Sequence, residues 1–217
     1  MKYSSGLKQR VGAVTAMGAA ILMSSCLPAP ELEVTYELTG LDKPWDLGWL
    51  PNGTMLVSER PGRLNIYADG NASSPTIIAP ADVVANSEGG MLGLEVDPDF
   101  ENNGYVYVCM CSDADGPTDV RLVRFQLDQT GDTVLDRRDI VTGMPYTSGR
   151  HSGCRPRFGP DGYLWVGTGD AALSSAPQDD DSLGGKVLRV TRDGQAAPDN
   201  PGGRLWYSKG HRNVQGM

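Results

Sequence analysis

Hydrophobic and polar residues alternate along the chain in many short runs that are bounded by turn residues, a pattern typical of β-strands. Strands are predicted over residues 31–38, 55–59, 64–67, 94–96, 105–111, 120–127, 134–141, 163–167 and 184–191, with another short strand before Pro160. Residues 41–48 are interpreted as a turn, and residues 198–201 as a loop. No sustained helical period or coiled-coil heptad is visible, so the sequence predicts an all-β protein.

A weak internal repeat organises these strands. A turn, a strand, a polar hairpin and a second strand recur at Pro51, Pro98 and Pro160, at irregular intervals near the length of one propeller blade, about 40–50 residues. Repeats of short strands at this length favour a β-propeller. A β-sandwich is the alternative architecture, but it accounts less well for the recurring turns.

Composition and charge narrow the range of partners. The chain of 217 residues carries 28 glycines and 15 prolines, which suits many short strands joined by turns. Its net charge is −8, and no run of basic residues is present to follow a phosphate backbone. Nucleic acid is therefore not an expected partner.

The N-terminus has the pattern of a targeting segment. Three basic residues precede an apolar stretch over residues 11–23, which is too short for a membrane span. A small residue then precedes Cys26, as in a bacterial lipoprotein cleavage site. Residues 1–25 are predicted to be a signal peptide, and 26–37 a tether with the first strand. An ordinary secretory signal, with Cys26 incidental, is the alternative. Both predict export to the periplasm or outer surface. The lipoprotein interpretation adds a lipid on Cys26, which would be the one membrane attachment.

Three further cysteines follow, and export makes a disulfide possible. Cys109 and Cys111 lie two positions apart on a predicted strand, so their side chains share one face. Either could pair with Cys154 if the strands are neighbours, which leaves one thiol over. A zinc site is disfavoured, because Cys-x-Cys within a strand lacks the usual ligand spacing.

The stretch over residues 150–170 holds one of the two histidines in the chain. His151 precedes a short strand, and Pro160-Asp161-Gly162 is then a strong turn signal, because proline fixes φ and glycine accepts a positive φ. His151 is thus expected at the start of a tight antiparallel hairpin, where a rigid sheet can aim its imidazole. Imidazole suits general-base chemistry near neutral pH. A histidine satisfied by local hydrogen bonds is the alternative.

Four motifs, taken together and in order, resemble the glucose/sorbosone dehydrogenase family, the soluble sugar dehydrogenases that depend on pyrroloquinoline quinone (PQQ). They are Pro44-Trp45-Asp46 with Glu59–Arg63, Glu88–Gly93 with Asp97–Phe100, the segment His151–Gly162, and Gly210–Gly216. The resemblance runs over residues 38–217. It implies a propeller of six four-stranded blades, of which about three are present here.

The resemblance also implies a cofactor and a set of site residues. PQQ would bind together with calcium, whose ligands are unknown. His151 would take the proton from the C1 hydroxyl of an aldose sugar while hydride passes to the quinone. Arg212 would place positive charge beside the quinone or its carboxylates, and Asn213 would hydrogen-bond the quinone edge. Glu88 stands where some members have a glutamine near the substrate.

Structural alternatives apply to each of these residues. Arg212 could form a surface ion pair, Asn213 could serve a turn, and Glu88 could order a loop. His211 is interpreted as a packing histidine, because the family's chemistry does not need it. The acidic run Asp179–Asp181 is interpreted as a solvated loop in preference to a calcium site.

The function predicted for the parent protein is oxidation of an aldose at C1 to the lactone. The sugar and the electron acceptor are not readable from the sequence. A non-catalytic propeller that binds a glycan or a protein is the alternative. Because about three of six blades are present, the chain is expected to be a fragment that binds the cofactor poorly and is inactive alone.

Overall fold

A computed structural model describes residues 32–35, 38–68 and 75–217. The chain divides into two compact units, Met1–Glu37 and Leu38–Met217, and every strand of the described residues lies in the second. The predicted signal peptide over residues 1–25 and its neighbour Cys26 lie outside the described residues.

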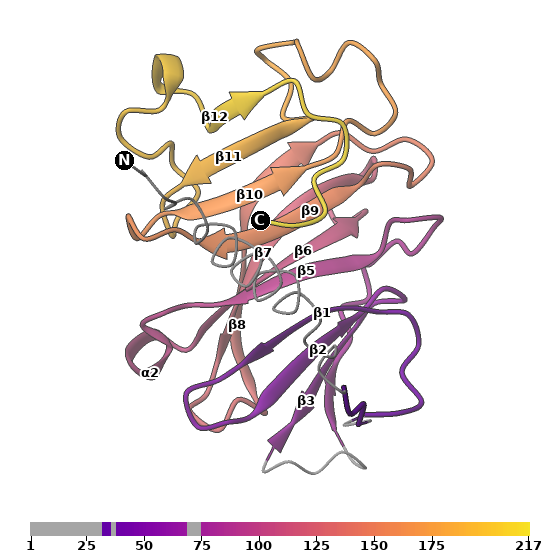
Figure 1. Ribbon diagram of the computed structural model, residues 1–217, viewed down its shortest axis with the longest axis vertical. Helices are drawn as coiled ribbons and strands as arrows, with labels where there is room; N and C mark the ends of the chain where they lie inside the picture. Colours follow the sequence, from indigo (N-terminus) through magenta and orange to yellow (C-terminus); the bar gives the residue numbers. More distant parts are fainter. Residues whose placement is uncertain (1–31, 36–37, 69–74) are drawn as a thin grey trace, which may run out of the picture. The chain divides into compact units, whose positions relative to one another are not determined.

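Three four-stranded antiparallel sheets, here called blades 1 to 3, make up the second unit (Figure 1). Blade 1 consists of β1 (Pro44–Trp49), β2 (Met55–Glu59), β3 (Arg63–Tyr67) and β4 (Thr76–Ile78). Blade 2 consists of β5 (Met91–Val96), β6 (Tyr105–Ser112), β7 (Asp119–Leu127) and β8 (Val134–Met144). Blade 3 consists of β9 (Gly153–Phe158), β10 (Leu164–Thr168), β11 (Lys186–Val190) and β12 (Trp206–Lys209). The short helices α2 (Phe100–Asn103) and η2 (Pro201–Gly203) lie in connections.

The first strands of the three blades lie next to one another, with β5 packed against both β1 and β9. Within each blade the strands pair in sequence order, so each blade is a meander of hairpins. This is the arrangement of a partial propeller, and the predicted all-β class is confirmed. The repeat noted at Pro51, Pro98 and Pro160 falls between the first and second strands of each blade. Each repeat therefore marks one blade.

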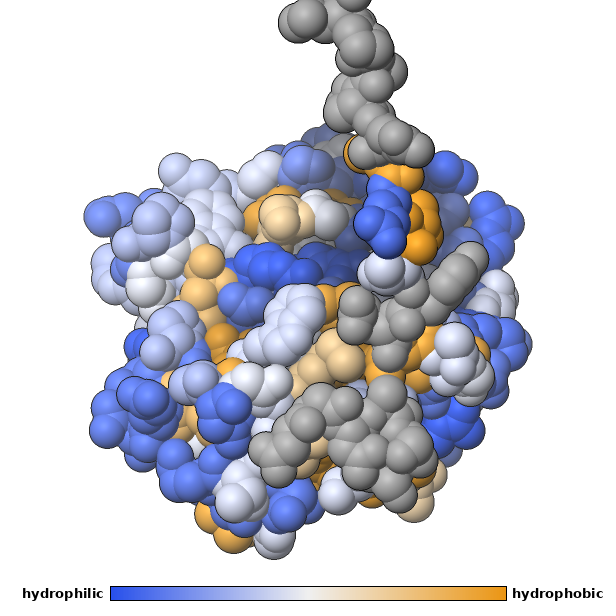
Figure 2. Space-filling model, turned by 60° about the horizontal axis from the view of Figure 1, so that its bottom comes forward, coloured by the Kyte–Doolittle hydropathy of each residue, from blue (hydrophilic) through white to orange (hydrophobic). Residues whose placement is uncertain are grey.

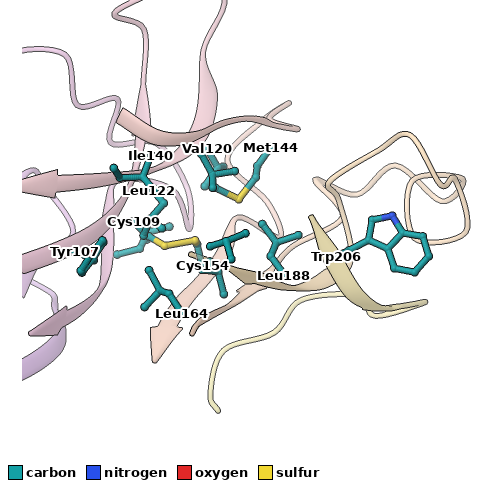
Figure 3. Close-up of a cluster of buried hydrophobic side chains, with 14 of the residues drawn as sticks. Tyr107, Cys109, Val120, Leu122, Ile140, Met144, Cys154, Leu164, Leu188 and Trp206 are labelled. Atoms are coloured by element: carbon teal, nitrogen blue, oxygen red, sulfur yellow. A yellow bond between two sulfur atoms is a disulfide. The ribbon is translucent and has the colours of Figure 1, made fainter. Parts of the chain in front are cut away.

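Hydrophobic side chains fill the spaces between the blades. The cluster between blades 1 and 2 includes Leu56, Leu64, Ile66, Val108 and Phe125. The cluster between blades 2 and 3 includes Tyr107, Cys109, Leu122, Cys154, Leu164 and Leu188 (Figure 3). Within it, Cys109 on β6 and Cys154 on β9 form a disulfide that joins the two blades. Alternation along each strand supplies one row of side chains to such a cluster and turns the other row away from it.

The surface carries the polar side chains that the net charge of −8 leads one to expect. The face seen in Figure 2 is mostly hydrophilic, with smaller hydrophobic patches between the polar residues. In the part of the chain that the structure describes, no helix has the length and apolar character needed to cross a bilayer.

The carboxylate of Asp46 links the first strands of all three blades. Asp46 lies on β1, and its Oδ2 accepts the backbone N–H of Leu94 on β5 at 3.0 Å. From β9, Arg157 donates to both carboxylate oxygens at 3.1 and 3.2 Å, and Arg155 makes a further ion pair. The Asp46 side chain is 7% exposed. Polar groups thus connect the blades where their first strands pack together.

Glycines permit this close approach. A Cβ on Gly93 of β5 would lie 2.5 Å from the carbonyl oxygen of Cys154 on β9. A Cβ on Gly48 of β1 would lie 2.8 Å from Leu94 Cδ1. Both distances are shorter than van der Waals contact. A side chain at position 93 would meet backbone and push blades 2 and 3 apart, whereas one at position 48 would displace the end of the buried Leu94 side chain.

Three strands were missed in the sequence analysis. β1 forms where a turn was predicted over residues 41–48, since proline is tolerated at the first position of a strand and β1 has little of the expected alternation. The short β4 and β12 lie at the outer edges of their sheets. Such strands are fixed by pairing with a neighbour more than by their own residue pattern.

One predicted strand is wrong in its described part. Residues 32–35 lie outside every strand, and Leu32 and Val34 are exposed. Alternation specifies a strand only where its apolar row is buried. Residues 31, 36 and 37 of the predicted strand lie outside the described residues.

Substitution of Asp46 tests whether the blades depend on its carboxylate. We expect Asp46→Ala to lower the free energy of unfolding by about 3 kcal/mol, because two arginines would lose a largely buried counter-charge. Urea unfolding followed by circular dichroism measures the change. Asp136→Ala, which removes an exposed carboxylate from β8, is the control and should change stability by no more than about 0.5 kcal/mol. Equal effects of the two substitutions would contradict the role given to Asp46.

A second ion pair, between Asp82 and Arg137, predicts a dependence of stability on pH. Arg137 on β8 donates to both oxygens of Asp82 at 2.6 and 2.7 Å, and holds the pKa of that carboxyl well below its usual range. A carboxyl whose pKa is depressed by folding stabilises the protein above its unfolded pKa, about 3.9, and this stabilisation is lost as the pH falls toward the folded value.

We therefore expect wild type and Asp82→Asn to differ by about 2 kcal/mol in free energy of unfolding at pH 7. The difference should shrink steadily below about pH 4. Urea titrations at a series of pH values measure it. A difference that stays constant between neutral and acidic pH would show that the charge of Asp82 contributes nothing.

Candidate active site

Loops from blades 2 and 3 meet at one end of the sheets. In an antiparallel sheet the start of one strand lies beside the end of its neighbour. The starts of β9 and β11 and the ends of β10 and β12 therefore lie on one edge of blade 3. The segment before β5 reaches the same place, because Glu88 contacts residues on two of these loops.

His151 and Asp170 form a buried pair at this edge. His151 lies just before β9, and Asp170 lies just after β10. The imidazole Nδ1 is 2.8 Å from Asp170 Oδ1, and both residues are 7% exposed. An ionised carboxylate can only accept a hydrogen bond, so in the neutral imidazole this contact places the proton on Nδ1 and leaves the lone pair on Nε2. Among the described residues no partner occupies Nε2.

The backbone of His151 is held in an unusual conformation. Its φ is 54°, in the left-handed region that residues other than glycine seldom adopt. Its N–H donates to Glu88 Oε2 at 2.8 Å, and its carbonyl oxygen accepts the N–H of Ala171 at 3.2 Å. Contacts on both sides of the residue therefore fix the direction of the imidazole.

Asn213 joins the same group of side chains. Its Nδ2 donates to Glu88 Oε2 at 3.2 Å, and its Oδ1 accepts the backbone N–H of Gly153 at 2.9 Å. Three of the residues singled out from the sequence, Glu88, His151 and Asn213, are thus in one hydrogen-bonded cluster. Glu88 lies 63 positions before His151 and 125 before Asn213 in the chain, and the fold brings them together.

Arg212 reaches the cluster through its backbone. Its carbonyl oxygen accepts the N–H of Asp170 at 2.8 Å, while its side chain is exposed. In the described part of the chain, the guanidinium of Arg212 has no hydrogen bond or ion pair with the protein. A surface ion pair, the alternative weighed for Arg212, is not formed there. The guanidinium of Arg212 is therefore available to an anionic partner.

Asp170 is the site residue that the sequence analysis missed. The signal available was a carboxylate directly after a strand, in Gly167-Thr168-Gly169-Asp170, but its partner lies on a different loop. Gly169 has its own role in the pair, because a Cβ there would clash with the carbonyl oxygen of His151. The glycine allows the start of β9 and the end of β10 to approach each other, which places Asp170 beside the imidazole.

Lys186 secures the loop that follows Asp170. It is fully buried at the start of β11, and its Nζ donates to the carbonyl oxygens of Ala176, Gly184 and Pro177 at 2.7, 2.8 and 3.1 Å. Burial lowers the pKa of Lys186. The three carbonyl oxygens belong to the loop over residues 171–184. Their hydrogen bonds to one ammonium group stabilise the conformation of this loop.

The three cysteines among the described residues form one disulfide and one free thiol. Cys109 is the partner of Cys154, and Cys111 remains a buried free thiol whose pKa is raised by burial. A thiol of raised pKa is a poor nucleophile at neutral pH. The disulfide lies three residues after His151 and anchors β9 to blade 2.

Two further predictions concern residues at the edge of the site. His211 Nε2 is 2.7 Å from Ser208 Oγ at the end of β12, in keeping with the packing role. In the acidic run, Asp180 pairs with Lys209 at 2.6 Å and Asp181 with Arg204 at 3.0 Å. Over the described residues, no group of three or more His, Cys, Asp or Glu side chains could hold a metal ion.

The fold and the site together define a class of protein, a β-propeller with an imidazole–carboxylate pair where the blade loops converge. The sequence model of the glucose/sorbosone dehydrogenase family matches residues 41–217, so the chain belongs to that family.

Named relatives agree with this assignment. The chain is 34% identical over 209 residues to aldose sugar dehydrogenase YliI of Escherichia coli, over 91% of this chain and 56% of that protein. It is 28% identical over 212 residues to quinoprotein glucose dehydrogenase B of Acinetobacter calcoaceticus, over 83% of this chain and 44% of that protein. The chain spans about half the length of the curated relatives it matches.

A solved structure supports the fold. The PQQ-bound aldose sugar dehydrogenase of Streptomyces coelicolor superposes with a TM-score of 0.74 at 36% identity. The match covers 83% of this chain and 54% of that one. The three blades described above therefore correspond to about half of a structure known to hold PQQ.

Gly169 provides a test of the geometry around His151. We expect Gly169→Ala to lower the free energy of unfolding by about 1–3 kcal/mol, because its Cβ would displace the His151 carbonyl. Thermal and urea unfolding measure the loss. Gly216→Ala is the matched control, since a Cβ there meets no atom within 4 Å. A Gly169→Ala protein as stable as this control would show that the two loops are farther apart than described.

Proposed function

We propose that the whole protein to which this chain's three blades belong is a PQQ-dependent sugar dehydrogenase that oxidises an aldose at C1 to the lactone. The observation that carries the proposal is the His151–Asp170 pair, in which a buried carboxylate holds the imidazole and leaves Nε2 without a partner in the described residues. Family membership and a PQQ-bound structural relative support the same chemistry.

His151 acts as the general base in this proposal. Its Nε2 removes the proton of the C1 hydroxyl, which gives C1 the alkoxide character that favours loss of hydride. Asp170 keeps the proton on Nδ1 and stabilises the imidazolium that forms, as a carboxylate does in other imidazole–carboxylate pairs. The bound quinone would supply the acceptor for the hydride.

The other members of the cluster suit the binding of PQQ. The free guanidinium of Arg212 can pair with the oxygens of an anionic cofactor, and a planar guanidinium does this well. Asn213 Nδ2 has a second proton beyond the one given to Glu88, which can reach the quinone edge. The predicted substrate contact of Glu88 stays a prediction, and it would use Oε1, since Oε2 already accepts two hydrogen bonds.

We propose calcium as a second cofactor of the whole protein and not of the three blades by themselves. The described residues offer no side-chain cluster that could ligate it. Export, and lipidation at Cys26, are also proposed for the whole protein on the N-terminal sequence pattern.

A non-catalytic propeller that binds a glycan or a protein remains the second candidate. It would retain the scaffold and would need no base. The buried pairing of His151 with Asp170 favours the enzyme, because a carboxylate-held imidazole with a free Nε2 has no evident use in a surface that merely binds a partner.

The decisive variant is His151→Ala in the whole protein, reconstituted with PQQ and calcium. We expect turnover of aldoses with an artificial electron acceptor to fall by about 10²–10⁴-fold, because general-base catalysis is lost. Circular dichroism should show that the fold is retained. Dye reduction under saturating sugar gives kcat directly.

The second histidine of the chain supplies the matched control. His211→Ala removes an imidazole that contacts Ser208, and it should leave kcat within about threefold of wild type. Unchanged turnover in His151→Ala would remove that residue from the chemistry. Failure of the wild-type protein to oxidise any aldose would favour the non-catalytic propeller.

A further inference from the structure

We propose that Glu88 is a positioning residue that holds the general base His151 and the amide of Asn213 as one unit. The expected effect on catalysis rests on the proposed function. The expected effect on the orientation of His151 rests on the hydrogen bonds alone. Glu88 lies in the loop before β5, so the residue belongs to blade 2 while both partners belong to loops of blade 3.

One oxygen of Glu88 carries both contacts. Oε2 accepts the backbone N–H of His151 at 2.8 Å and Nδ2 of Asn213 at 3.2 Å. Hydrogen bonds to an ionised acceptor are stronger than those between neutral groups. Because both donors meet at a single atom, a shift of either segment changes the position of the other.

The backbone conformation of His151 explains why this acceptor matters. A non-glycine residue with a φ of 54° has more favourable conformations available, and it stays in place only when its surroundings hold it. The N–H of His151 is one of the two backbone groups through which this happens. Loss of the Glu88 acceptor would therefore let His151 leave the orientation that pairs it with Asp170.

The loop that carries Glu88 is itself held firmly. Arg60 of blade 1 donates to the carbonyl oxygens of Ser87 and Gly89, on either side of Glu88. Asn86 exchanges backbone hydrogen bonds with Gly89 at 2.9 and 3.2 Å, and its Nδ2 donates to Ser148 O at 3.3 Å. A carboxylate on a fixed loop can position its partners, whereas one on a free loop would follow them.

A residue that acts through position and a residue that contacts the sugar respond differently to substitution. In Glu88→Gln the amide oxygen can take the place of Oε2 and accept both donors, although the charge is lost. In Glu88→Ala no acceptor remains. Glu101→Ala, which removes an exposed glutamate from α2, is the matched control.

The first measurement is hydrogen exchange of the His151 amide in the whole protein without cofactor. We expect exchange in Glu88→Ala to be faster than in wild type by about tenfold or more, because the amide loses its acceptor. In Glu88→Gln and Glu101→Ala it should stay within about threefold of wild type. Equal His151 exchange in Glu88→Ala and wild type would overturn the proposal.

The second measurement separates kcat from KM in the same proteins loaded with PQQ. We expect Glu88→Ala to lower kcat and the affinity for PQQ, each by about tenfold, with KM for the aldose little changed, and Glu88→Gln to restore both. If both variants instead raise KM with kcat unchanged, Glu88 contacts the sugar and the positioning role is wrong. If the wild-type protein oxidises no aldose, the proposed function fails, while the exchange experiment still decides the role of Glu88.

Discussion

The contacts of Asp46 are the constraint on which the arrangement of the three blades depends. Sheets that pack face to face are held by apolar side chains, but their first strands meet where backbones come too close for large apolar residues. Glycines at positions 48 and 93 make room there, and the carboxylate of Asp46 satisfies donors from the two following blades. A carboxylate with several donors is costly to bury unless all of them are present. The ionic contact therefore favours the packing in which β5 and β9 both supply their donors to Asp46 on β1.

The candidate site inherits its geometry from this packing. Glu88 comes from blade 2, and His151, Asp170 and Asn213 come from three different connections of blade 3. A displacement of blade 3 against blade 2 would separate Glu88 from its two donors. The disulfide between Cys109 and Cys154 restrains that displacement close to the site. The chemistry is thus assembled by contacts between blades and does not lie within any one of them.

The sequence predicted those parts of the fold that depend on local patterns. Turns at Pro51, Pro98 and Pro160 and the alternation of the middle strands were sufficient for the all-β class and the blade repeat. The first strand β1 was missed because its residues face neighbouring strands at close range and show little alternation. The strand predicted over 31–38 shows the converse, since alternation was present in its described part without burial. Local pattern predicts a strand well only when a single face of it is buried.

The same limit applies to the site residues. The motifs around His151, Asn213 and Glu88 were recognisable as segments, but no sequence pattern says that one oxygen of Glu88 accepts from both partners. Asp170 was missed because its meaning lies in a contact with a residue on another loop. Likewise, both Cys109 and Cys111 were open as partners of Cys154, and only the packing of β6 against β9 decides between them. Sequence patterns identify the chemical groups, whereas tertiary packing determines their partners.

The side chains of the candidate site differ in how firmly the protein holds them before a ligand binds. The imidazole of His151 is buried, paired and held through its backbone, so its orientation requires no rearrangement when a substrate binds. The guanidinium of Arg212 is exposed and has no partner within the described residues, although its backbone is tied to Asp170. A group that must act as a base gains from preorganisation, because reorganisation during the reaction would add to the barrier. A group that recognises an anion can be ordered by that anion, and the entropy lost is then part of the cost of binding. The proposed base is thus the rigid member of the cluster, whereas the exposed side chain of Arg212 is held by no contact within the described residues.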